Sequence, residues 1–266
     1  MDKVYFATDR HQTRTYRHWA EELGCGLELY AFAEPDILAG DWRTVLREHQ
    51  QILAGFTGGL GLHGAFYDMV SGSLDPDIVA LTRKRYLQNL FIAAELGASS
   101  VVFHLNYMGL LRFPNYRPGW HQRQVAFWRK LGQRAAHYGI TVVMENLWED
   151  EPSLLTDILR EVDNPYVRAC LDVSHATLFS HVPLTDWVSA LSPWLYSCHL
   201  NNHDGHIDLH WSLDNGVINY REVLPLFRQI TPPPILTLEL STPERIAASL
   251  PLLHLPGTNH HGPING

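Results

Sequence analysis

Short apolar runs alternate with longer amphipathic stretches along most of the chain. The runs are rich in β-branched and aromatic residues and nearly continuous in hydrophobicity, which is typical of strands buried on both faces of a parallel sheet. They predict eight strands, at residues 3–8, 26–32, 58–65, 99–105, 140–146, 167–174, 195–201 and 234–240. The stretches between them carry helix start and stop signals and predict helices at 14–23, 41–54, 76–96, 118–138, 153–162, 185–191, 220–230 and 243–250.

Eight alternating strands and helices predict an α/β fold, a single-domain (β/α)8 TIM barrel spanning residues 1–255. The length of 266 residues suits one such barrel. The main rival is an open doubly wound sheet, which normally carries a Gly-rich turn after its first strand. Here the first strand runs into ATDRHQTRT, which contains no glycine. The polar, Gly-rich residues 256–266 are expected to form a flexible tail.

The chain is acidic, with a formal net charge of −8 and only three Lys among its 20 basic residues. This balance disfavours long nucleic acid as a partner, because duplex binding needs many cationic side chains. We expect a small-molecule substrate, no membrane association and a cytoplasmic location, since the sequence shows neither a long apolar span nor a signal peptide. The three cysteines have no metal-site spacing, and the sequence leaves the oligomeric state open.

Metal-binding residue types end six consecutive predicted strands. In a barrel these ends meet at one mouth, where the active site lies. Further His and Asp residues follow the sixth and seventh strands. A glutamate within an apolar run is costly to bury unless it is paired or bound to a cation. We therefore predict a divalent metal site, with zinc expected first and Mn or Fe also compatible, built from His63, His104, Glu145, Asp172, His175, His199, Asp208, His210 and Glu239.

Polar and aromatic residues near these positions are candidate substrate contacts. They are Asn106, Asn146, Asn201, His203, Arg112 and Trp148. Arg112 lies in a long loop that is the expected place for substrate specificity. Asparagines are also favoured in strand-to-loop turns, and aromatic residues also pack loops, so both interpretations stay open.

The ordered motifs GLHG, VVFH, MEN, CLDVSH, CHLNN, DLH and LEL resemble the xylose isomerase-like TIM-barrel superfamily over about residues 3–250. That superfamily contains endonuclease IV and many sugar isomerases and epimerases. The resemblance to the epimerases implies one metal, held by Glu145, Asp172, His199 and Glu239. The resemblance to endonuclease IV implies up to three metals. In that pattern His63 and His104 hold the first, Glu145 bridges the first and second, Asp172, His199 and Glu239 complete the second, and His175, Asp208 and His210 hold the third.

All nine positions of the three-metal pattern are filled, whereas the epimerases' sugar-binding Arg is replaced by Gly205. These differences favour a metal-dependent hydrolase of a phosphodiester or phosphoester in a small or nucleotide-like substrate, with Glu145 and Glu239 as catalytic residues. Cobamide-remodelling hydrolases of the same superfamily resemble this case. The alternative is a sugar or sugar-phosphate isomerase or epimerase acting by acid/base proton transfer. An abasic-site DNA endonuclease is disfavoured by the charge, and a non-catalytic binding barrel by the number of ligands.

Overall fold

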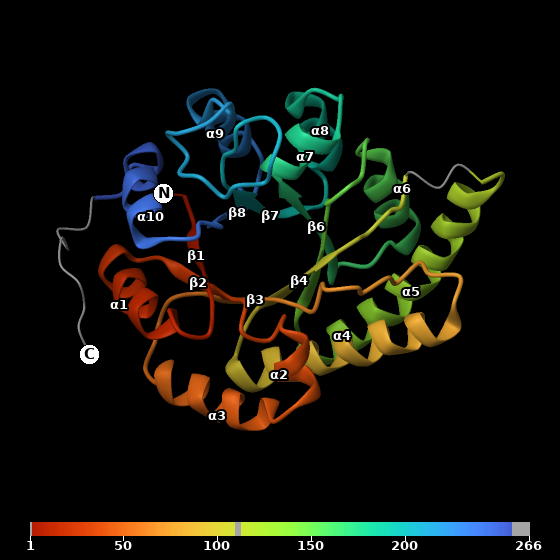
Figure 1. The fold of residues 1–266 in the computed structure, drawn as a ribbon, viewed down its shortest axis with the longest axis horizontal. Coiled ribbons are helices and arrows are strands. Elements are labelled where there is room, and N and C mark those ends of the chain that lie inside the picture. Colours follow the sequence, from red (N-terminus) through yellow and green to blue (C-terminus); the bar gives the residue numbers. More distant parts are fainter. Residues whose placement is uncertain (1, 110–112, 257–266) are drawn as a thin grey trace.

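The chain folds into one closed barrel of eight parallel strands in sequential order, which confirms the predicted (β/α)8 fold (Figure 1). The computed structural model describes residues 2–109 and 113–256. The strands are β1 Val4–Thr8, β2 Gly26–Leu29, β3 Leu60–His63, β4 Ser100–His104, β5 Thr141–Glu145, β6 Val167–Asp172, β7 Leu195–Leu200 and β8 Ile235–Leu238. Each expected strand is present, and each is shorter than the apolar run that predicted it.

Helices surround the barrel and cover the outer face of the strands (Figure 1). Their bounds are α1 Thr13–Leu23, α2 Pro35–Ala39, α3 Trp42–Ile52, α4 Pro76–Leu96, α5 Tyr116–Tyr138, α6 Ser153–Val162, α7 Val173–Phe179, α8 Leu184–Leu191, α9 Tyr220–Arg228 and α10 Pro243–Ser249, followed by the 3-10 helix η1 Leu250–Leu253. The helix ends follow local chemistry. Asp75 accepts a hydrogen bond from the Asp77 amide at the start of α4, and Gly97 ends that helix at a φ of +70°.

Two short helices were not predicted from the sequence. Helix α2 has only five residues and lies within a connection. Helix α7 begins directly after β6, so its first residues were included in the predicted strand 167–174. The carboxylate of Asp172 caps α7 by accepting a hydrogen bond of 2.6 Å from the His175 amide. This helix therefore orients two of the candidate metal ligands.

Successive side chains along each strand point to opposite faces of the barrel wall and form two separate apolar layers. Outward residues pack with the helices in the main core, whereas a separate cluster inside the barrel contains Val102, Val143 and Cys170. Two residues further along β4, β5 and β6, the same face presents His104, Glu145 and Asp172. An apolar floor thus lies beneath the polar groups at the carboxyl ends of the strands.

Within the part of the chain that the structure describes, no helix combines the length and hydropathy needed to cross a bilayer. Cys25, Cys170 and Cys198 are buried and carry free thiols. The expected flexible tail lies almost entirely outside the described residues, so its flexibility stays a prediction.

Candidate metal centre

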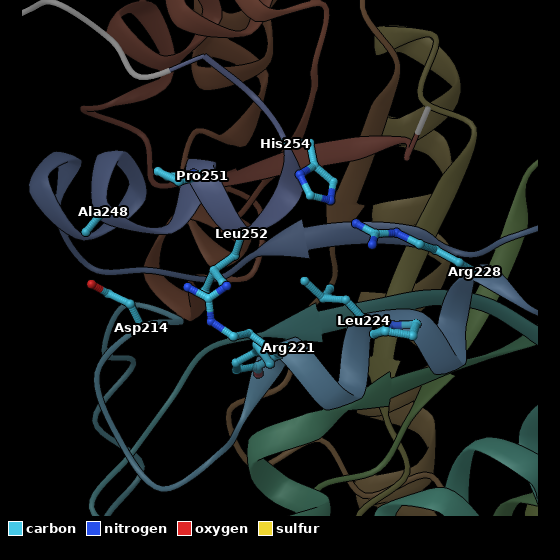
Figure 2. A pocket seen from close by; sticks show the side chains of 10 residues that line it. Asp214, Arg221, Leu224, Arg228, Ala248, Pro251, Leu252 and His254 are labelled. Carbon is cyan, nitrogen blue, oxygen red and sulfur yellow. The ribbon is translucent and has the colours of Figure 1, made fainter.

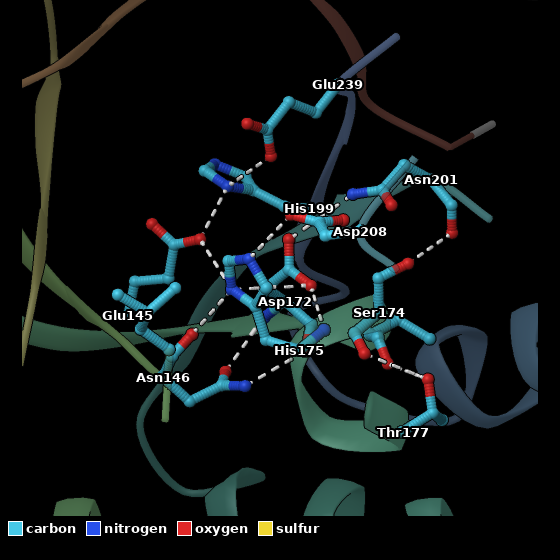
Figure 3. A network of polar contacts seen from close by, with 12 residues as sticks. Glu145, Asn146, Asp172, Ser174, His175, Thr177, His199, Asn201, Asp208 and Glu239 are labelled. Carbon is cyan, nitrogen blue, oxygen red and sulfur yellow. Dashed lines mark hydrogen bonds and ion pairs between the residues drawn. The ribbon is translucent and has the colours of Figure 1, made fainter. Parts of the chain in front are cut away.

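All nine predicted ligands come together at the mouth of the barrel. Two overlapping groups each place possible ligand atoms within 4.8 Å of one another: His63 with Glu145 and His199, and Glu145 with Asp172, His199 and Glu239. Figure 3 shows Glu145, Asp172, His175, His199, Asp208 and Glu239 converging from different strands and loops. The strand-end reasoning thus placed these side chains correctly in space, while their role as ligands remains a proposal.

Glu145 is the central carboxylate of the cluster and is fully buried. Its Oε2 lies 3.3 Å from the Nε2 atoms of both His63 and His104. Its Oε1 accepts a hydrogen bond of 3.0 Å from His199 Nδ1. Burial alone would raise the pKa of Glu145, but His199 and His104 hold it well below its usual value. A charged carboxylate in this position can bridge two cationic groups.

Asp208 links two histidines in a further group on the same side of the mouth. Its Oδ2 lies 3.3 Å from His175 Nε2 and 3.1 Å from His210 Nε2. His210 belongs to the loop after β7, and its backbone is left-handed, with a φ of +47°. Asp208 thus contacts both imidazoles, although these three side chains do not form one of the groups whose possible ligand atoms all lie within 4.8 Å of one another.

Backbone carbonyls fix the orientation of three of the histidines. The Nδ1 atoms of His63, His175 and His210 donate to carbonyl oxygens at 3.0, 3.0 and 2.8 Å. Each ring therefore turns its Nε2 toward a carboxylate oxygen, at 3.1 to 3.3 Å. A neutral ring would face that oxygen with a lone pair, and two acceptors repel each other. Each contact consequently requires a cation, which is either a proton or a metal ion.

The residues present fit a divalent metal. Asp208 Oδ1 and Glu239 Oε2 are buried and have no hydrogen-bond partner among the described residues. Glu239 Oε2 does lie 3.2 Å from His199 Nδ1, but that nitrogen directs its hydrogen to Glu145. Against the effect of burial, Asp172 and Asp208 raise the pKa of His175 to about 10, and Glu239 and Asp208 do the same for His210. The same carboxylates that raise these pKa values would also favour a bound cation.

A cavity of about 460 Å³ opens over this cluster. His63, His104, His175, Asp208, His210 and Glu239 line its polar side. Its rim carries aromatic side chains, of which Tyr67 is 46% exposed and Trp148 is 45% exposed. The described residues that line it include neither Lys nor Arg. Among these described residues, positive charge for an anionic group could come only from protonated histidines or bound cations.

The predicted substrate contacts divide into several environments. Asn106 and Trp148 line the cavity, whereas Arg112 lies outside the described residues. Asn146 joins β5 to β6, because its side chain both donates to and accepts from the backbone of Asp172. The Nδ2 of Asn201 lies 3.5 Å from Asp172 Oδ2. Both ring nitrogens of His203 are used within the protein, by Thr177 Oγ1 and the Gly205 amide.

The loop carrying Asp208 and His210 is held by residues that the sequence analysis did not single out. Buried Asn202 forms hydrogen bonds with Leu213 O, Ile218 O, Ile218 N and His203 N, which close the base of the loop. Arg245 of α10 donates to the carbonyl oxygens of Leu209 and His210, both at 2.9 Å. These contacts fix the left-handed turn at His210.

Strand β2 and the residue that follows it add two polar side chains that were also missed. Glu28 is buried, and its Oε1 lies 3.0 Å from His199 Nε2. Tyr30 lines the cavity with a buried hydroxyl that has no hydrogen-bond partner among the described residues. A glutamate within the apolar run GLELYAF was the available signal, by the same burial argument that identified Glu145.

A separate cavity of about 390 Å³ lies outside the barrel between α9 and η1 (Figure 2). It is lined in part by Arg221, Arg228 and His254. Arg228 already forms hydrogen bonds of 2.7 to 3.3 Å with Asp2. None of the candidate ligands lines this cavity, so we place the chemistry at the barrel mouth.

The fold and the site together define a parallel (β/α)8 barrel with a histidine and carboxylate cluster at the carboxyl ends of its strands. Residues 18–254 match the family model described as xylose isomerase-like TIM barrel, and the chain belongs to this family. The superfamily resemblance noted from the motifs is thereby confirmed.

The chain is similar to several proteins of known structure and to one curated relative. It is similar to the TTHB071 protein of Thermus thermophilus, solved after soaking with ZnCl2, at 29% identity and a TM-score of 0.78, over 96% of this chain and 97% of that one. It is also similar to a D-tagatose 3-epimerase-like protein, at 19% identity and a TM-score of 0.76, over 94% and 95%. The uncharacterized protein MJ1311 of Methanocaldococcus jannaschii is 23% identical over 176 residues, which are 64% of this chain and 60% of that protein, so the chain spans less than two thirds of this relative.

Further solved neighbours are named as sugar epimerases. The comparisons add no support for the phosphodiester hydrolase that we expected first. At 19% identity or less, these epimerase neighbours show the shared fold alone.

Proposed function

We propose that this chain is a metal-dependent hydrolase that cleaves a phosphodiester or phosphoester in a small or nucleotide-like molecule. The observation that carries this proposal is the group of His175, Asp208 and His210 beside the Glu145 cluster. A single metal at Glu145, Asp172, His199 and Glu239 would not use these three side chains as ligands. A multinuclear centre uses all nine side chains.

In this proposal each ion has its own group of ligands. His63, His104 and Glu145 would hold one, Glu145 with Asp172, His199 and Glu239 a second, and His175, Asp208 and His210 a third. Divalent ions, with zinc expected first, supply positive charge for phosphate oxygens and acidify water.

The chain's own residues then perform the remaining steps. Glu145 and Glu239 both contact His199 Nδ1, at 3.0 and 3.2 Å. Glu239 lines the cavity, so it is the carboxylate better placed to accept a proton from an attacking water, whereas Glu145 would bridge two ions. The backbone contacts of the histidines keep their Nε2 atoms directed at the reaction centre, which lowers the cost of assembling it.

The cavity suits an extended ligand with a flat part. Tyr67 and Trp148 expose aromatic faces at the rim, while the polar side holds the candidate ligands. A base-bearing phosphodiester would place its phosphate at the centre and its ring against the rim. The nucleotide loop of a cobamide has this chemistry and belongs in the substrate panel.

The direct test is to load the purified protein with Zn, Mn or Fe, count the bound ions by mass spectrometry, and assay a substrate panel. The panel contains an activated aryl phosphodiester, nucleotide diesters, cobamides, abasic DNA, ketoses and ketose phosphates. We expect about three ions per chain and hydrolysis of a diester, since multinuclear sites stabilise both the attacking and the leaving oxygen. One tightly bound ion with ketose turnover and no diester cleavage would refute the proposal.

The second candidate is a one-metal sugar or sugar-phosphate isomerase or epimerase. The names of the structural neighbours support it, and Glu145 and Glu239 could act as its acid and base. Gly205 stands where the epimerases carry their sugar-binding Arg, which leaves this candidate without that substrate contact. The same panel separates the two, because ketose interconversion and diester cleavage have different products.

A further inference from the structure

We infer that Glu28 is a positioning residue of the metal centre: its carboxylate orients His199 from inside the barrel. This inference rests on the proposed metal centre and adds to it a residue outside the nine-ligand pattern. Glu28 lies on β2, whereas His199 lies on β7, so the contact crosses the interior of the barrel.

The contact joins a buried carboxylate and a buried imidazole ring. Glu28 is 3% exposed and His199 is 0% exposed, and Glu28 Oε1 lies 3.0 Å from His199 Nε2. Neither atom has a hydrogen-bond partner among the described residues. A buried carboxylate and a buried imidazole nitrogen are each costly alone, so their close approach offsets both costs.

The other oxygen of Glu28 is anchored separately. Thr237 Oγ1 on β8 donates to Glu28 Oε2 at 3.1 Å. Thr237 also pairs in register with His199 across β7 and β8. The carboxylate is thus held on one side and directed at the ring on the other.

The opposite edge of the same ring faces the candidate ligands. His199 Nδ1 lies 3.0 Å from Glu145 Oε1 and 3.2 Å from Glu239 Oε2. Glu28, His199 and the centre therefore form a carboxylate–histidine–ligand series. If an ion took the place of the proton on Nδ1, the remaining ring hydrogen would lie on Nε2 and face Glu28. In such series the outer carboxylate makes the imidazole a stronger ligand, and its loss typically weakens metal binding about 10- to 100-fold.

The sharpest test is the isosteric variant Glu28→Gln, measured for metal binding as well as activity. Glutamine keeps the size and an oxygen that can accept from Thr237, but it removes the negative charge behind His199. We expect zinc binding measured by chelator competition to weaken about 10- to 100-fold at one ion. We also expect a changed visible spectrum after loading with Co²⁺. A role limited to filling space predicts no change in either measurement.

Ser197→Ala is the matched control. Ser197 lies on the interior face of β7, two residues before His199, and its buried hydroxyl has no hydrogen-bond partner among the described residues. This variant should keep the zinc affinity and the Co²⁺ spectrum of the original protein. Thr237→Val is the second test variant, because it frees the carboxylate without removing it, and a loss of about two- to tenfold is expected.

The outcomes separate this inference from the proposed function. If the original protein binds no divalent ion, both proposals fail. If it binds ions and Glu28→Gln matches it in affinity and spectrum, the role of Glu28 alone is refuted. If Glu28→Gln does not fold, the affinity of Thr237→Val decides, and an unchanged value refutes the inference.

Discussion

Replacing His210 by Ala tests the third ligand group with little disturbance elsewhere. The ring contacts Asp208 Oδ2 at 3.1 Å through Nε2 and the carbonyl of Glu239 at 2.8 Å through Nδ1. The backbone there is left-handed, at a φ of +47°. Both His and Ala are strained in that conformation, so the substitution reports on the side chain.

The size of the effect follows from the number of ligands. A structural zinc site with four ligands binds with about 10–16 kcal/mol, which is roughly 2.5–4 kcal/mol for each ligand. Since about 1.4 kcal/mol is tenfold in an equilibrium constant, loss of His210 should weaken that ion about 10²- to 10³-fold. We expect the ion content to fall from about three per chain to about two, and diester hydrolysis to fall at least about 100-fold.

The assay combines ion counting after dialysis with hydrolysis of an activated phosphodiester. His206→Ala is the control, because His206 is exposed, lies in the same loop and does not line the cavity. A His210→Ala variant that binds as many ions as the original protein and hydrolyses the diester at the same rate would refute the reasoning. Retained ketose turnover with an unchanged single ion would favour the epimerase.

Four further outcomes are expected. Glu145→Ala should abolish both hydrolysis and ketose turnover, at least about 10³-fold in an activity assay, because its carboxylate serves both chemistries; measurable activity near the original level would contradict the common site. Binding of the ion at His175, Asp208 and His210 should release about two protons at pH 8, seen by calorimetry in buffers of different ionisation enthalpy, because ligands must be deprotonated and the pKa values of His175 and His210 are raised to about 10. The apparent affinity of that ion should fall as the pH falls, and a pH-independent affinity would oppose this assignment. Asn202→Ala should lower the free energy of unfolding by about 2–3 kcal/mol, because it leaves buried backbone groups unpaired. A lowered Tm would report this loss, and an unchanged Tm would count against the role of Asn202 in the loop. Tyr30→Phe should keep the Tm, since the Tyr30 hydroxyl has no hydrogen-bond partner among the described residues. If that hydroxyl contacts the substrate, kcat/KM should fall about tenfold. An unchanged kcat/KM would exclude the contact.

The strand-end ligands could be predicted because two regular periods determine their position. A parallel barrel gathers the carboxyl ends of its strands at one mouth. Side chains alternate along each strand, so the last interior residue of a run faces that mouth. His63, His104, Glu145 and Asp172 each end an observed strand, and Glu239 follows the last residue of β8. Local pattern alone was sufficient for these positions.

Glu28 and Tyr30 escaped prediction because the apolar run around them continues beyond the strand. Strand β2 ends at Leu29, whereas the sequence run extends to residue 32. The apparent strand end therefore fell on apolar residues. Asn202 was missed for a different reason, since its partner Ile218 lies 16 residues away and only the folded loop brings them together.

Charge balance connects the fold to the choice between the two reactions. Glu145, Asp172, Asp208 and Glu239 place four carboxylates around one centre, above an apolar floor that cannot solvate them. One divalent ion leaves this centre short of positive charge, with protons on the remaining histidines, which suits an uncharged sugar. Three divalent ions would bring six positive charges against four negative ones, and the excess would attract a phosphate group. Because the described cavity lining contributes neither Lys nor Arg, the number of bound ions sets how much positive charge these residues offer to an anionic substrate.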